Sequence, residues 1–183
     1  MPSKPREELD TRLKDFDELM LARDLVCPDG RGRSQERQGA AILRSSVVLL
    51  SAAFEAYVEE VYDEAVDLVF AQVTQGERNT LKNDTSGNLH NATTSKVNRL
   101  FFNLGIPWIM HHRRVRWQKF SNESVREDLN RIVKTRNAVA HGESPYIRKA
   151  TVIRWKGVIE RLADRIDAIV AGHVEEQTGA RPW

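Results

Sequence analysis

The longest helical pattern in the chain is centred on Ser51-Ala52-Ala53-Phe54-Glu55-Ala56-Tyr57-Val58-Glu59-Glu60. Around this stretch, apolar residues recur at intervals of three or four, which is the spacing of one face of an α-helix. The apolar positions are Leu43, Val47, Leu50, Phe54, Val58, Val61, Ala65 and Leu68. The spacing predicts one helix over about residues 40–75. Its first half is apolar around most of its circumference, which is typical of the central helix of a bundle.

Four further segments have the same periodicity. They are the residues between Ser3 and Cys27, residues 94–104, the residues that follow Ser124, and residues 151–171, which end at Gly172. Ser124 and Glu127 have the spacing of a capping box, which favours a helix start at Ser124. No segment alternates with a period of two, as a half-buried strand would. We therefore predict an all-α fold, an antiparallel bundle of about five helices.

The 183 residues are enough for one domain with its own hydrophobic core. We expect residues 1–35 to form an N-terminal helix and loop within this domain, residues 36–172 to form the main bundle, and residues 173–183 to form a flexible tail. Residues 76–92 are rich in Asn, Thr and Gly, which predicts a mobile polar loop.

Composition and the N-terminal sequence indicate a soluble, cytoplasmic protein without a membrane partner. The single cysteine, Cys27, excludes a disulfide within the chain. No apolar segment follows the N-terminus as in a signal peptide, and the longest apolar run, residues 47–58, is too short to cross a bilayer. The net charge of +2 is too small to indicate nucleic-acid binding by itself.

The segment whose side chains are best suited to catalysis is Arg136-Asn137-Ala138-Val139-Ala140-His141-Gly142. Arg136 continues the apolar stripe of its helix, so we expect its guanidinium to need an acceptor. Asn137 and His141 share a helix face, whereas Arg136 and His141 lie roughly 140° apart around a helix. Two explanations are open: the helix ends before His141, with Gly142 at the cap, or a second copy of the chain completes the site.

Judged by spacing alone, a structural role is the commoner one for such residues. His141 would then be stabilised by the dipole at the helix end, and Arg136 would form a structural ion pair. Glu55, in its apolar surroundings, is expected to be partly buried and to support the site as a partner of Arg136. The alternative is that Glu55 lies with Glu59 on a solvated face beside Arg44.

Residues 108–120 contain no acid and interleave aromatic with basic side chains, a mixture that can bind phosphates while stacking bases. The predicted RNA-binding residues are Arg113, Arg114, Arg116, Trp117 and Lys119. Alternatively, Trp108 or Trp117 anchors the segment to the bundle. His111 and His112 lack further ligands at metal-binding spacing, so we predict no metal site and no other cofactor.

The R-N-x-x-x-H arrangement of Arg136, Asn137 and His141, followed by Gly142, resembles the motif of the HEPN superfamily, and in particular its bacterial ribonuclease-type branches. The acidic residue in the apolar and aromatic run around Glu55 is a second similarity. The order of helices agrees over roughly residues 40–171.

This resemblance implies a metal-independent endoribonuclease, a homodimer in which two motifs meet to form a composite active site. His141 would act as general base or acid, Arg136 would stabilise the transition state, and Asn137 would be the positioning residue, which orients the imidazole or donates to the phosphate. The products would be a 2′,3′-cyclic phosphate and a 5′-hydroxyl.

The resemblance also implies a toxin or antiviral defence effector, controlled by an antitoxin or another regulatory protein. Some branches carry a modified tyrosine two residues after the histidine, but Glu143 occupies that position here. The alternative is a non-catalytic HEPN-like module that binds nucleotide or RNA or serves as a dimeric adaptor.

Overall fold

The predicted all-α fold is confirmed by the computed structural model, which describes residues 1–28, 32–118 and 120–183. Within these ranges the α-helices are α1 (Lys4–Val26), α2 (Arg33–Val69), α3 (Gln75–Thr85), α4 (Thr94–Phe102), α5 (Asn122–Ala140) and α6 (Lys149–Thr178). Two short 3₁₀ helices, η1 (Ser86–Asn88) and η2 (Ile109–His111), lie in the connections. The described residues form six α-helices rather than about five, and their one β-type contact is an isolated bridge between Trp117 and Phe120.

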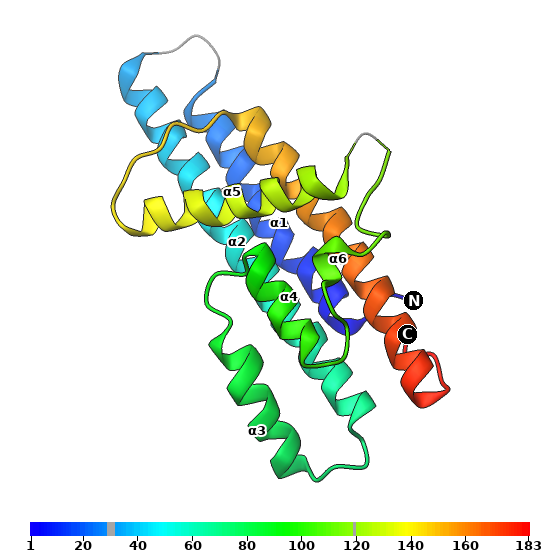
Figure 1. Ribbon diagram of the computed structural model, residues 1–183. Helices are drawn as coiled ribbons and strands as arrows, with labels where there is room; N and C mark the ends of the chain where they lie inside the picture. The colour runs from blue at the N-terminus through cyan, green and yellow to red at the C-terminus, as the bar shows by residue number, and fades with distance from the viewer. Residues whose placement is uncertain (29–31, 119) are drawn as a thin grey trace.

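The central helix is α2, which contacts α1, α3, α4, α5 and α6. Figure 1 shows α1, α2 and α6 side by side, with α5 crossing them and with α3 and α4 along the far half of α2. The α2 side chains Tyr57, Val58, Val61 and Tyr62 are fully buried. Tyr57 donates from its hydroxyl to the carbonyl of Ala163 at 2.8 Å, which ties α2 to α6. By length and composition α2 would also suit a membrane span, a property that central bundle helices share.

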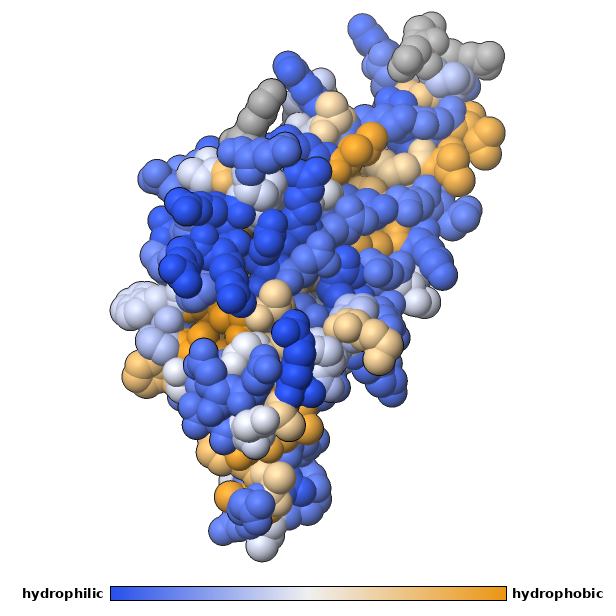
Figure 2. All heavy atoms as spheres, turned by 90° about the vertical axis from the view of Figure 1, so that its right-hand side faces the viewer, coloured by the Kyte–Doolittle hydropathy of each residue, from blue (hydrophilic) through white to orange (hydrophobic). Residues whose placement is uncertain are grey.

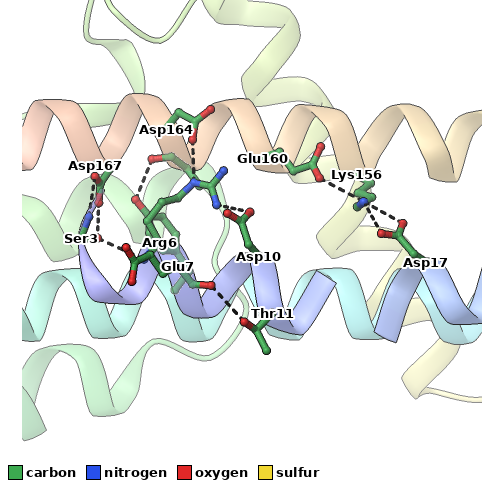
Figure 3. Close-up of polar contacts among 12 residues, drawn as sticks. Ser3, Arg6, Glu7, Asp10, Thr11, Asp17, Lys156, Glu160, Asp164 and Asp167 are labelled. Atoms are coloured by element: carbon green, nitrogen blue, oxygen red, sulfur yellow. Dashed lines mark hydrogen bonds and ion pairs between the residues drawn. The ribbon is translucent and has the colours of Figure 1, made fainter. Parts of the chain in front are cut away.

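Polar contacts fasten α1 to α6 along its length (Figure 3). Ser3 caps α1 and also bonds Asp167 of α6 through its hydroxyl and its backbone N–H. Farther along the helix pair, Lys156 contacts Asp17 of α1 at 2.8 Å. Because these contacts accompany a row of buried apolar residues on α1, the N-terminal helix packs as an integral layer of the bundle.

The C-terminal helix is longer than predicted, so the expected end at Gly172 is wrong. Helix α6 continues to Thr178, and Gly179 ends it with a φ of 76°. Val174 is buried, and Nε2 of His173 lies 2.9 Å from the carbonyl oxygen of Leu104. The helix continues because this additional turn still has a surface to pack against, so only residues 179–183 lie beyond it.

The segment predicted as a mobile loop, residues 76–92, contains helix α3, so that prediction is wrong for most of its length. Helix α2 ends at Val69 instead of near residue 75. Thr74 and Glu77 form a capping box at the start of α3, and the hydrogen bonds from Thr74 lower the pKa of Glu77. Leu81 packs against the core from this helix.

Candidate functional site

Helix α5 carries the Arg/Asn/His motif and is fixed to α6 by a buried carboxylate. Asp128, only 3% exposed, accepts two hydrogen bonds from Arg154 and one from Nε1 of Trp155 at 3.3 Å. A buried charge with both a cationic partner and a further donor holds a defined position. The motif helix therefore has a fixed orientation relative to the core.

The start of α5 differs from the prediction. Its N-cap is Ser121, whose hydroxyl accepts from the backbone N–H of Ser124 at 3.1 Å. The predicted capping box of Ser124 and Glu127 is therefore wrong. Ser121 and Ser124 both have the residue type that favours an N-cap, and the helix begins at the earlier of the two.

The end of α5 is a Schellman motif that places His141 outside the helix. Gly142, with a φ of 84°, donates from its N–H to the carbonyl of Val139, and Glu143 donates to the carbonyl of Ala138 at 2.9 Å. His141 is the C-cap residue, with φ −87° and ψ 10°. Of the two explanations open from the sequence, the helix does end before His141. Its imidazole is exposed and makes no hydrogen bond with any residue of the described ranges.

Arg136 is only partly buried and is held by neutral acceptors. Its Nη1 donates to Oδ1 of Asn137 at 3.0 Å and to Oδ1 of Asn91 at 3.1 Å. No carboxylate within residues 1–28, 32–118 and 120–183 forms an ion pair with Arg136, which excludes the structural ion pair for this part of the chain. A guanidinium held by carboxamides keeps its full positive charge and remains able to bind an anion.

The expected pair of Glu55 with Arg136 does not form. Instead, Oε2 of Glu55 accepts from the backbone N–H of Ala92 at 3.3 Å, and the neighbouring Asn91 receives the bond from Arg136. The turn at Asn91 and Ala92 thus links half-buried Glu55 to Arg136. The connection runs through the backbone of this turn and not through an ion pair, and the supporting role of Glu55 stays a prediction.

Asn91 contacts the motif from outside it, and no pattern in the sequence points to this residue. It has a φ of 63°, in the left-handed region, which Asn tolerates better than most residues. This conformation lets its side chain reach α5 while the next N–H bonds Glu55. Asn91 lies 45 positions before Arg136, so helical periodicity gives no signal for the contact.

Glu59, one helical turn after Glu55 on α2, has a pKa raised to about 7. The main cause is burial, which disfavours the charged carboxylate, and the negative charges of Glu55, Asp63 and Glu60 add to it. This carboxyl group therefore gains or loses its proton near neutral pH. The charge of the Glu59 side chain, one turn from Glu55, consequently changes near pH 7.

The predicted RNA-binding residues lie at the other end of α5 from the motif. Arg113, Arg114 and Arg116 are exposed, and Arg114 donates to the carbonyl of Ala168 on α6 at 3.3 Å. Arg136 follows Asn122, the first residue of α5, by 14 positions, a rise of about 21 Å, so the two groups are separate within one chain. Lys119, also predicted to bind RNA, lies outside the described residues.

Trp117 is buried and stacks on Phe120, with ring centroids 5.6 Å apart. This position agrees with the alternative in which its ring anchors the segment to the bundle. Figure 2, which views the right-hand side of Figure 1, shows hydrophilic side chains over most of that face and smaller hydrophobic patches between them. Among the described residues there is no group of three or more metal-ligating side chains.

Comparison with models of protein families places the motif within a matched region. The family model described as RiboL-PSP-HEPN matches residues 11–172. The matched region includes the positions of Glu55, Asn91 and the whole Arg136 to His141 motif. Comparison with curated proteins and with solved structures gives no match.

Proposed function

The chain belongs to the RiboL-PSP-HEPN family, and from this membership and the geometry of α5 we propose that it is a metal-independent endoribonuclease. The observation that carries the proposal is the state of Arg136. It is a cation held in place by two carboxamides without a carboxylate partner in the described part of the chain, five positions before the exposed His141. This arrangement suits binding of a phosphodiester.

The proposed reaction is attack of the RNA 2′-hydroxyl on its own phosphodiester. His141 acts as general base or acid, because an imidazole exchanges protons near neutral pH. Arg136 stabilises the negative charge that accumulates on the phosphorane oxygens. Asn137 accepts from Arg136 through Oδ1, which leaves its Nδ2 to donate to the phosphate or to orient His141. The products are a 2′,3′-cyclic phosphate and a 5′-hydroxyl.

We propose that the active form is a homodimer with a composite active site. Within one chain, the side chain of His141 has no partner among the described residues that fixes its tautomer or its direction. A catalytic imidazole needs such a partner to work efficiently. A second copy of the motif supplies donors and acceptors of the required kinds at this exposed helix end.

In the cell, an enzyme of this kind acts on cytoplasmic RNA as a toxin or defence effector and needs an antitoxin or other regulatory protein to control it. The alternative function, a non-catalytic RNA-binding or nucleotide-binding module or a dimeric adaptor, makes a different prediction. It requires RNA or nucleotide binding, or dimer formation, without any product.

The test incubates the purified full chain with single-stranded RNA and transfer RNA in excess chelator. Wild type is compared with His141→Ala and Arg136→Ala, and with Arg131→Ala as a control because Arg131 is an exposed arginine on the same helix. We expect cleavage by the wild type and the control and a loss of cleavage in the two motif variants. Cleavage that stops when chelator is added contradicts the mechanism, and tight binding without products favours the alternative module.

A further inference from the structure

A second feature of α5 is a pocket of about 540 Å³ where this helix meets α4 and η2. Its size is within the range of small-ligand sites in proteins. The residues that line the pocket include Asn98, Arg99, Phe102, Trp108, His111 and Asn130. Asn130 precedes Arg136 by six positions on α5, a rise of about 9 Å, so one extended ligand can reach both.

Two large aromatic rings of this pocket are open to solvent. Phe102 is 65% exposed and Trp108 is 66% exposed. Trp108 also has a left-handed backbone, with φ 56° and ψ 42°, a conformation that is unfavourable for a bulky side chain. Its ring meets that of His111 edge to face at 5.6 Å. The fold therefore maintains a strained conformation that displays an indole ring at the pocket, which points to a ligand that stacks.

The hydrogen bonds of Asn98 determine the tautomer of His111. Oδ1 of Asn98 accepts from the backbone N–H of Met110 at 2.8 Å, so its Nδ2 is the atom 3.3 Å from Nδ1 of His111. Because Nδ2 can only donate, Nδ1 must be unprotonated, and the ring proton is on Nε2. Burial and the charge of Arg126 lower the pKa of His111, which favours this neutral form. His111 therefore offers an N–H donor.

Arg99 and Asn130 offer further donors in the pocket. Arg99 is exposed and forms no ion pair within the described part of the chain, and none of the described residues that line the pocket is acidic. Oδ1 of Asn130 accepts from the N–H of Thr94 at 3.1 Å, which leaves its Nδ2 to donate. A fitting ligand must supply a flat ring, several acceptors and negative charge.

We propose that this pocket binds one unpaired nucleobase of an RNA strand whose neighbouring phosphodiester reaches Arg136. The base stacks on Trp108, its acceptor atoms face His111 Nε2 and Asn130 Nδ2, and its phosphate contacts Arg99. Base stacking on an aromatic ring with an arginine nearby is the general means by which proteins hold single strands. The proposal rests on the proposed ribonuclease function, because it treats that strand as the substrate.

The test measures binding of a labelled single-stranded RNA with 2′-O-methyl groups throughout, which cannot be cleaved. Fluorescence anisotropy with the full chain gives Kd without any dependence on catalysis. We expect Trp108→Ala and Arg99→Ala each to raise Kd about tenfold, and Trp108→Phe to stay within about twofold of wild type. Arg161→Ala, an exposed arginine on α6, is the matched control and should leave Kd unchanged.

Circular dichroism and light scattering of each variant complete the design. Equal Kd values for wild type, Trp108→Ala and Arg99→Ala, or no binding by the wild type, overturn the proposal. A change of molecular mass in Trp108→Ala with unchanged RNA affinity also overturns it, because the surface then contacts another protein chain. Trp108-dependent binding without cleavage by the wild type supports the pocket and contradicts the ribonuclease. Cleavage by the wild type that is unchanged in Trp108→Ala and Arg99→Ala supports the ribonuclease and contradicts the pocket.

Discussion

Nη1 of Arg136 donates to Oδ1 of Asn91 at 3.1 Å, and this contact joins the motif helix to the turn before α4. The Asn91→Gly variant tests its role, because glycine keeps the left-handed backbone while it removes the acceptor. We expect the free energy of unfolding to stay within about 1 kcal/mol of the wild-type value. RNA cleavage should fall by about tenfold or more, since the guanidinium loses one of its two acceptors and its orientation.

The Asn91→Asp variant is the complementary change. A carboxylate at this position forms an ion pair with Arg136 and competes with the phosphate for it. We expect weaker RNA binding than in the wild type, which titration with an uncleavable RNA measures. Full cleavage and full binding in both variants would show that Asn91 does not position Arg136.

The Schellman motif at Gly142 gives a prediction about stability and one about activity. Gly142→Ala forces a side chain into a φ of 84°, although no atom lies within 4 Å of the new Cβ. We expect a loss of about 1–2 kcal/mol from backbone strain alone, and reduced cleavage because His141 is displaced. Urea denaturation measures the loss of stability, and the RNA cleavage assay measures the loss of activity.

Gly157→Ala is the matched control, because Gly157 lies within α6 and its added Cβ would also meet open space. Its backbone is helical, so alanine should stabilise the protein by up to about 1 kcal/mol. The two glycine-to-alanine substitutions should thus change the free energy of unfolding in opposite directions: Gly142→Ala lowers it and Gly157→Ala raises it. If both stabilise the protein, the Schellman motif at the end of α5 is not present in solution.

The carboxyl group of Glu59 should make stability depend on pH. Its pKa is about 7 in the folded protein, above the ordinary value of 4.5, so the folded state binds more protons between these values. Stability from this group is therefore present at low pH and is lost as pH rises from about 4.5 through about 7. Glu59→Gln should be more stable than wild type at pH 8, by about 1 kcal/mol after allowance for solvent screening, and similar to it at pH 5.

Urea unfolding of both proteins at the two pH values measures this difference. Glu18→Gln, on the exposed face of α1, serves as the control and should leave the pH dependence as it is in the wild type. The raised pKa predicts that the stability difference between Glu59→Gln and wild type is larger at pH 8 than at pH 5. An equal difference at the two pH values would contradict it.

Asp128 joins α5 to α6, and Asp128→Ala should destabilise the fold. The change removes the acceptor of Trp155 Nε1, which lies in a buried environment, and leaves Arg154 without its partner. The expected loss is about 2–3 kcal/mol, which thermal unfolding measures. Asp164→Ala is a milder comparison, because Asp164 is 57% exposed and its pair with Arg6 is screened by solvent. Equal losses in the two variants would contradict the special role of Asp128.

Local patterns in the sequence predicted most of the helices, because the buried faces of α1, α2, α4, α5 and α6 each recur at helical spacing. They failed at α3, where polar composition suggested a loop although Thr74 and Glu77 already had the capping-box spacing. The end of α5 before His141 was predictable because a glycine, Gly142, directly follows His141. The contacts of Arg136 with Asn91 and of Glu55 with Ala92 were not, since Asn91 and Ala92 lie in a turn whose position depends on tertiary packing.

The most direct test of the central claim uses an RNA with one cleavage site and a copy in which the nucleotide before that site is 2′-deoxy. Both are incubated with the wild type in excess chelator, and the products are analysed by mass spectrometry. The account predicts a 2′,3′-cyclic phosphate and a 5′-hydroxyl from the first RNA and no cleavage at that bond in the second. Equal cleavage of the two RNAs, or products with a 5′-phosphate, would contradict it.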